Sequence, residues 1–117
     1  MASKTESKEL VQEAANLAAD KKASEIIILD LRKVSDIADF FLLASANTNR
    51  QLSSIADNIL GGLKKKRKNP DVEGEKDWIL VDYGDVIIHL FTQETRDYYP
   101  IERLWKDAEK QELGSSL

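Results

Sequence analysis

Two stretches of the chain have the apolar periodicity of amphipathic helices. The first contains Leu10, Val11, Ala14, Leu17 and Ala18. It follows Ser3 and Glu6, which have capping-box spacing, and predicts a helix that ends near Asp20. The second contains Leu52, Ile55, Ala56, Ile59, Leu60 and Leu63. It follows Thr48 and Gln51, which repeat that spacing, and predicts a second amphipathic helix.

Four shorter apolar runs have the length of strands. Residues 25–31 form a β-branched run of the kind that is buried on both faces of a sheet, and residues 40–44 form a second one. Residues 78–82 and 86–91 flank the short Tyr83-Gly84-Asp85 segment, which is typical of a tight turn. The pattern therefore predicts two further strands joined as a hairpin.

The remaining segments are polar or short. Residues 64–74 predict a polar loop, and residues 94–99 predict one helical turn that Pro100 interrupts. Residues 101–108 predict a short last helix, with a frayed tail from about residue 110. The order of elements predicts a single α/β domain over residues 1–117, with a mixed sheet flanked by helices.

Composition narrows the class of protein. The chain has 117 residues, of which 42% are hydrophobic and 32% charged, as in a globular domain with one core. It has no cysteine, which excludes disulfides, thiolate zinc sites and cysteine nucleophiles. The first twenty residues lack the apolar stretch of a signal peptide, and no apolar run is long enough to cross a membrane. We expect a cytoplasmic protein.

The charge is unevenly distributed. The formal net charge is −4, yet Lys64, Lys65, Lys66, Arg67 and Lys68 are consecutive, so the rest of the chain is strongly acidic. An acidic surface argues against a general grip on nucleic acid and favours a basic protein partner. The basic run itself has two interpretations: contact with RNA phosphates, or a solvated segment that complements the dipole at a helix C-terminus.

Several blocks of sequence resemble the ribosomal silencing factor (Iojap) family. The signature-like stretch Leu-Asp-Leu-Arg-Lys-Val-Ser-Asp-Ile-Ala-Asp-Phe-Phe occupies residues 29–41. Agreement continues at Asn49-Arg50-Gln51 and Ile55-Ala56-Asp57, in the most recognisable block at residues 78–89, and from Glu94 to Ala108. The resemblance covers roughly residues 8–108 in the family's order and spacing.

This resemblance implies a fold, a partner and an activity. The fold would be nucleotidyltransferase-like but without the catalytic residues. The protein would bind the large ribosomal subunit through its ribosomal protein numbered fourteen and block association with the small subunit, which represses translation. Off the ribosome, the family is described as dimeric. One departure is Ala46, which follows Ser45 where the family often has glycine, and it would be strained if that glycine has a positive φ.

The residues themselves argue against an enzyme. Nucleotidyl transfer needs a glycine-serine turn near phosphate and two or three carboxylates that share metal ions. No glycine precedes Ser45, no Asp-x-Asp pair follows, and Asp82 and Asp85 have the spacing of turn-capping acids. His89 is the single histidine, which excludes a multi-histidine metal site. We therefore predict no catalytic, cofactor-binding or metal-binding residue; an RNA-binding or ribosome-assembly module that uses the basic run is the alternative function.

The predicted partner site is the second hairpin and the segment after it, where aromatic and acidic residues gather. Aromatic side chains dominate binding hot spots, and acids would face a basic protein. Ordinary core packing is the alternative for the aromatic residues, and a hydrogen-bonded structural role is the alternative for the histidine. The predicted partner-binding residues are Trp78, Asp82, Tyr83, Asp85, His89, Tyr98 and Glu102.

Overall fold

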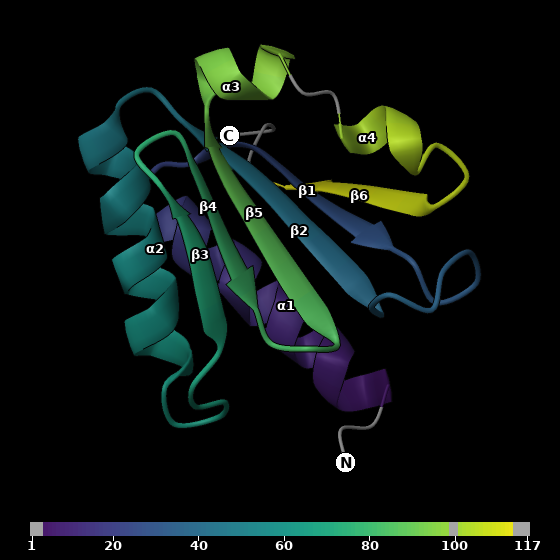
Figure 1. The fold of residues 1–117 in the computed structure, drawn as a ribbon. Helices are drawn as coiled ribbons and strands as arrows, with labels where there is room; N and C mark the ends of the chain where they lie inside the picture. The colour runs from purple at the N-terminus through teal and green to yellow at the C-terminus, as the bar shows by residue number, and fades with distance from the viewer. Residues whose placement is uncertain (1–3, 99–100, 114–117) are drawn as a thin grey trace.

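A mixed sheet of six strands forms the centre of the molecule (Figure 1). The computed structural model describes residues 4–98 and 101–113. The strands are β1 (Ser24–Asp30), β2 (Phe40–Ala46), β3 (Asp71–Glu75), β4 (Trp78–Asp82), β5 (Val86–Thr92) and β6 (Glu109–Leu113). Their order is β3-β4-β5-β2-β1-β6, with β2 and β5 parallel and every other neighbouring pair antiparallel. This confirms the predicted α/β class and mixed sheet.

Two long helices, α1 (Lys4–Asp20) and α2 (Asn49–Leu63), cover one face of the sheet. In the view of Figure 1, α1 runs behind the strands. The helices bury their apolar stripes against strand residues of that face, and we call this core the helix-side cluster. Its strand members are Ile26, Ile28, Phe40, Leu42, Ala44, Ala46, Val81, Val86, Ile88 and Leu90.

The opposite face carries a second, smaller core because alternate strand residues point to opposite faces. Its buried members, the open-side cluster, are Ile27, Leu29, Leu31, Ala38, Phe41, Leu43 and Phe91. The short helices α3 (Gln93–Tyr98) and α4 (Ile101–Leu104) precede residues that pack on this cluster, including Trp105 and Ala108. Two long helices therefore cover one face of the sheet, whereas only the short segment of α4 and the residues after it covers part of the other face.

Local signals account for the start of α2. The Thr48 side chain accepts a hydrogen bond from Gln51 N–H at 3.0 Å, and the Gln51 side chain accepts one from Asn47 N–H at 2.8 Å. These two bonds satisfy donors that a helix start leaves unpaired. The predicted pairing of Thr48 with Gln51 is confirmed, whereas Ser3 lies outside the described residues.

Two strands overturn predictions from the sequence. Residues 71–74, predicted as part of a polar loop, belong to β3 (Asp71–Glu75), and residues 109–113, where a frayed tail was predicted to begin, form β6 against β1. The last helix is also shorter than predicted, because α4 ends at Leu104. Ala46 is not strained: it is the buried last residue of β2, and it is not among the residues with positive φ.

None of the described helices is long and apolar enough to cross a membrane.

Candidate functional site

An apolar groove of about 410 Å³ lies on the open side of the sheet. Its lining is almost entirely carbon, from strands β2, β4 and β5 on one side and the α4 segment on the other. The lining residues are Phe41, Trp78, His89, Ile101, Arg103, Leu104 and Trp105.

Strand register places the aromatic floor of the groove. Phe41 and His89 project from the parallel neighbours β2 and β5, and their rings meet edge to face at 4.8 Å between centroids. Trp78 is the first residue of β4, pairs with Phe91 in register and lies 4.9 Å from that ring. Trp105 closes the groove from the α4 side, with its ring 5.6 Å from Phe41 and perpendicular to it. Edge-to-face contacts of this kind fix the side chains in place.

His89 is the polar group in the groove floor, and its side chain is 8% exposed. Neither ring nitrogen is hydrogen-bonded to any part of the chain that the structure describes. Burial lowers the pKa of His89 to about 4, because the charged form loses its hydration. The imidazole is therefore neutral at pH 7.

The rim of the groove is exposed. Leu104 is 77% exposed although it is a large apolar residue, and Arg103 beside it is exposed and charged. A large exposed apolar side chain at the edge of an apolar groove is typical of a surface that binds another molecule.

Of the predicted partner-binding residues, the structure brings Trp78 and His89 together in this groove. Asp82 lies on the same face by strand alternation, at the other end of β4, about 13 Å along the strand from Trp78. Its carboxylate accepts a hydrogen bond from Gly84 N–H at 2.7 Å, so it caps the turn of the hairpin as its spacing predicts.

Tyr83 and Asp85 lie away from the groove. Tyr83 is half-buried against the helix-side cluster, and burial raises the pKa of its phenol. Asp85 is bound by both ends of the Arg67 guanidinium, which holds the pKa of this carboxyl below its usual range. These two residues therefore support the hairpin from the helix-covered side.

The last two predicted residues follow β5. Tyr98 ends α3 and is 76% exposed. Glu102 lies in α4, and its side chain is outside the described part of the structure. The groove also contains residues that were not predicted from the sequence: Phe41, Ile101, Arg103, Leu104 and Trp105. Phe41 belongs to a continuous apolar run with no alternation to mark its face, and nothing in the sequence placed α4 opposite it.

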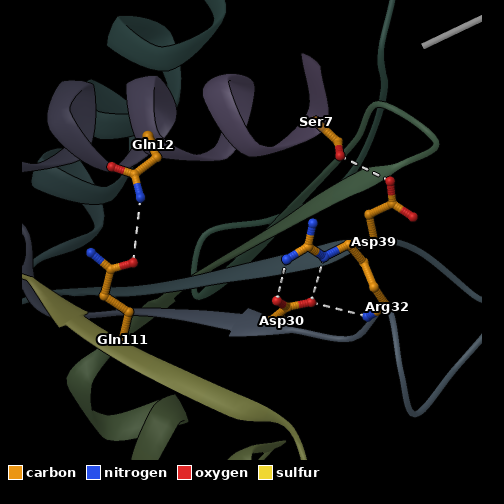
Figure 2. Close-up of polar contacts among 6 residues, drawn as sticks. All are labelled: Ser7, Gln12, Asp30, Arg32, Asp39 and Gln111. Carbon is orange, nitrogen blue, oxygen red and sulfur yellow. Dashed lines mark hydrogen bonds and ion pairs between the residues drawn. The ribbon is translucent and has the colours of Figure 1, made fainter. Parts of the chain in front are cut away.

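Two carboxylates at either end of the segment between β1 and β2, Asp30 and Asp39, are hydrogen-bonded to neighbouring side chains (Figure 2). Arg32 donates to both oxygens of Asp30, at 2.9 Å and 2.7 Å, and lowers the pKa of that carboxyl. Ser7 donates to Asp39 at 2.9 Å. Across residues 4–98 and 101–113, no three histidines or acids lie together where they could hold a metal ion.

The residues of the basic run, 64–68, fall into two groups: two form ion pairs with acids elsewhere in the fold, and three are exposed. Lys66 pairs with Glu13 of α1 at 2.6 Å, and Arg67 pairs with Asp85. Lys64, Lys65 and Lys68 are exposed after the end of α2. Part of the run thus holds the fold together, and the other lysines remain on the surface.

These features define a small α/β protein in which helices cover one face of the sheet and the other face carries an open aromatic groove. The model of the family described as "Ribosomal silencing factor during starvation" matches residues 4–116. The chain belongs to the ribosomal silencing factor family.

Relatives agree with this assignment in sequence and in structure. A ribosomal silencing factor of Halalkalibacterium halodurans is 39% identical over 112 residues, which cover 90% of this chain and 92% of that protein. A crystal structure of a Bacillus halodurans protein superposes with a TM-score of 0.78 at 34% identity, covering 91% of this chain and 99% of that one. The mouse "Mitochondrial assembly of ribosomal large subunit protein 1" is 30% identical over 96 residues, covering 77% of this chain and 42% of that protein.

Proposed function

We propose that this protein binds the large ribosomal subunit through ribosomal protein fourteen and blocks association with the small subunit. Translation is thereby repressed in the cytoplasm. The observation that carries the proposal is an aromatic groove left open on a member of the silencing factor family. The name of the mouse relative, which refers to assembly of the large subunit, supports the choice of subunit.

The groove has the character of a protein-docking surface. Two tryptophans, Trp78 and Trp105, and the exposed Leu104 offer large apolar area around one cavity. Central aromatic residues surrounded by a polar rim carry most of the free energy in many interfaces. The acidic balance of the chain, with Asp82 on the same sheet face, complements a basic ribosomal protein.

The proposed mechanism is steric and makes or breaks no bond, so we propose that the protein is not an enzyme. It needs only enough affinity for one subunit to occupy a surface that the other subunit requires. Off the ribosome we expect a homodimer, as the family resemblance implies. The same resemblance carries the expectation of a nucleotidyltransferase-like fold.

Sedimentation of purified ribosomal subunits with and without the protein tests the proposal. We expect the parent to move with the large subunit and to reduce the amount of joined ribosome. Leu104→Ala should weaken binding about tenfold, equivalent to about 1.4 kcal/mol, with little effect on folding because the side chain is exposed. Val72→Ala is the matched control, because Val72 is exposed on β3 and does not line the groove.

Two outcomes would contradict the proposal. If the parent leaves subunit joining unchanged at saturating concentration, the anti-association function is wrong. If Leu104→Ala and Val72→Ala bind alike while the parent blocks joining, the function stands and the groove is the wrong site.

A further inference from the structure

The two ring nitrogens of His89 make no hydrogen bond within the described part of the folded chain. Its side chain is 92% buried, since only 8% is exposed, and neither nitrogen has a hydrogen-bond partner in the described structure. Buried polar groups almost always have a partner, so each exception calls for an explanation. If this position served packing alone, Phe would stabilise the fold more than His, because Phe has no polar atom to leave unpaired.

In the folded chain, the described neighbours of His89 do not supply that partner. Phe41 contacts the ring by its edge, Phe91 stacks at 6.0 Å, and Trp78 lies at 6.2 Å between centroids. Arg103, the charged residue of the groove's lining, lies at the exposed rim, and its guanidinium does not bond the imidazole in the described structure. The groove is therefore the direction from which a hydrogen-bonding group can come.

We propose that His89 is a specificity-determining residue: the partner segment that fills the groove carries an uncharged hydrogen-bonding group that bonds the imidazole. A backbone peptide, a side-chain amide or a hydroxyl has this chemistry. The inference rests on the proposed function and names the chemistry that the partner presents there.

The requirement for an uncharged group follows from burial. A charged group brought into this apolar groove would lose its hydration, and a neutral imidazole offers one donor and one acceptor rather than a compensating charge. A purely apolar segment fits the floor but leaves the imidazole unpaired in the complex. His89 thus selects for a polar atom flanked by apolar side chains, and selects against an all-apolar segment.

Access to the nitrogens requires the lining to part, because both atoms are buried in the free protein. Phe41, Trp78 and His89 are fixed on strands, whereas Leu104 and Trp105 come from a helix of four residues and the turn after it. So short a helix has little stability of its own, so we expect the opening on this side of the groove, with loss of the contact between Trp105 and Phe41.

The single histidine makes a direct test possible. The chain is labelled with ¹⁵N-histidine, and its imidazole resonances are recorded alone and with isolated ribosomal protein fourteen. We expect binding to bring one ring N–H into slow exchange and to shift the ring towards a single tautomer. Unchanged imidazole resonances in a saturated complex would overturn the inference.

Two variants provide an independent test. His89→Phe keeps the aromatic ring and removes both nitrogens, so it should melt no lower than the parent while its dissociation constant for ribosomal protein fourteen rises at least tenfold. His89→Gln keeps a donor and an acceptor and should bind more tightly than His89→Phe. Equal binding by the parent and His89→Phe would contradict the proposal, because a merely structural histidine predicts that result.

Failure of this inference can be told apart from failure of the proposed function. If the parent does not bind ribosomal protein fourteen, both are wrong. If the parent binds, Leu104→Ala weakens binding and His89→Phe does not, the groove is the site and the role of His89 is wrong.

Discussion

Arg67 and Asp85 form a bidentate ion pair, with Nη1–Oδ1 at 2.9 Å and Nη2–Oδ2 at 2.8 Å. The pair joins the segment after α2 to the turn between β4 and β5, two regions that the chain separates by 18 residues. Arg67 also donates to the carbonyl of Tyr83 at 3.4 Å. The hairpin that positions Trp78 and His89 is thereby anchored to the helix-covered side of the sheet.

Asp85→Asn should lower the free energy of unfolding by about 2 kcal/mol. The pair is mostly buried, with side chains 22% and 19% exposed, so loss of one charge leaves the other poorly hydrated. Lys66→Gln is the control: it breaks the Glu13 pair, in which Lys66 is largely solvated, and should have a much smaller effect. Urea unfolding of both variants measures the difference, and equal losses would show that the Arg67 pair contributes no more than an exposed one.

Burial of His89 should make the protein less stable in mild acid. Its pKa is about 4 when folded and 6.5 in an unfolded chain, so the unfolded state binds the proton first as pH falls. Stability should decrease between pH 6.5 and pH 4, by roughly 3 kcal/mol in all, and be fully present above pH 6.5. Unfolding curves across this range provide the measurement.

The same curves for His89→Phe should lose the slope between pH 6.5 and pH 4. The Asp85 carboxyl does not interfere, because Arg67 lowers its pKa and its contribution is lost only in stronger acid, as pH falls through the folded pKa. A slope that persists in His89→Phe would assign it to another group.

Arg96→Met should destabilise the fold by about 2–3 kcal/mol. Arg96 is a buried residue of α3 whose guanidinium donates to the Glu25 carbonyl at 2.7 Å and to the Ser45 hydroxyl at 2.8 Å. Its removal leaves the buried Ser45 hydroxyl and the partly buried Glu25 carbonyl without this donor. Thermal unfolding is the measurement, with Arg103→Met as the control because Arg103 is exposed. Similar melting temperatures for the two variants would contradict this role.

Changing Lys64, Lys65 and Lys68 together to Gln should leave ribosome binding within about threefold of the parent, since the proposed site lies on the opposite side of the sheet. These lysines are exposed, and the change spares Lys66 and Arg67, which hold ion pairs. Binding to large subunits is compared at two salt concentrations. A loss greater than tenfold with a reduced salt dependence would favour the RNA-contact alternative.

Incubation with magnesium and labelled nucleotides should give only background nucleotidyl transfer. Asp30 and Asp39 are hydrogen-bonded to Arg32 and Ser7, and Asp82 caps a turn. Turnover that Asp30→Ala or Asp82→Ala abolishes would show that the protein is an enzyme.

The sequence predicted those elements whose side chains carry a burial pattern, and missed two strands that lack one. Both long helices and the four apolar strands have the expected periodicity. β3 reads Asp-Val-Glu-Gly-Glu and β6 reads Glu-Lys-Gln-Glu-Leu, and each lies at an edge of the sheet. Their pairing with the sheet rests mainly on main-chain hydrogen bonds, which most residue types can form, so no side-chain pattern indicates it.

The site was predicted in part for a similar reason. Trp78 and His89 belong to one hairpin, so local periodicity was enough to place them near each other. The rest of the groove lining comes from Phe41 and from residues 101 and 103–105, far apart in sequence. Their meeting depends on the parallel pairing of β2 with β5 and on the path of the chain after α3, which are tertiary features.

The two edge strands, β3 and β6, affect the tendency of the protein to aggregate at high concentration. Unpaired main-chain groups at a sheet edge invite other chains to add strands, the first step towards aggregates. Here β3 carries Asp71 and Glu73, and β6 carries Glu109, Lys110 and Glu112, so an incoming strand meets charged side chains at either edge. The protein can therefore leave the apolar groove side of its sheet exposed while the charged edge strands disfavour growth of fibres by strand addition.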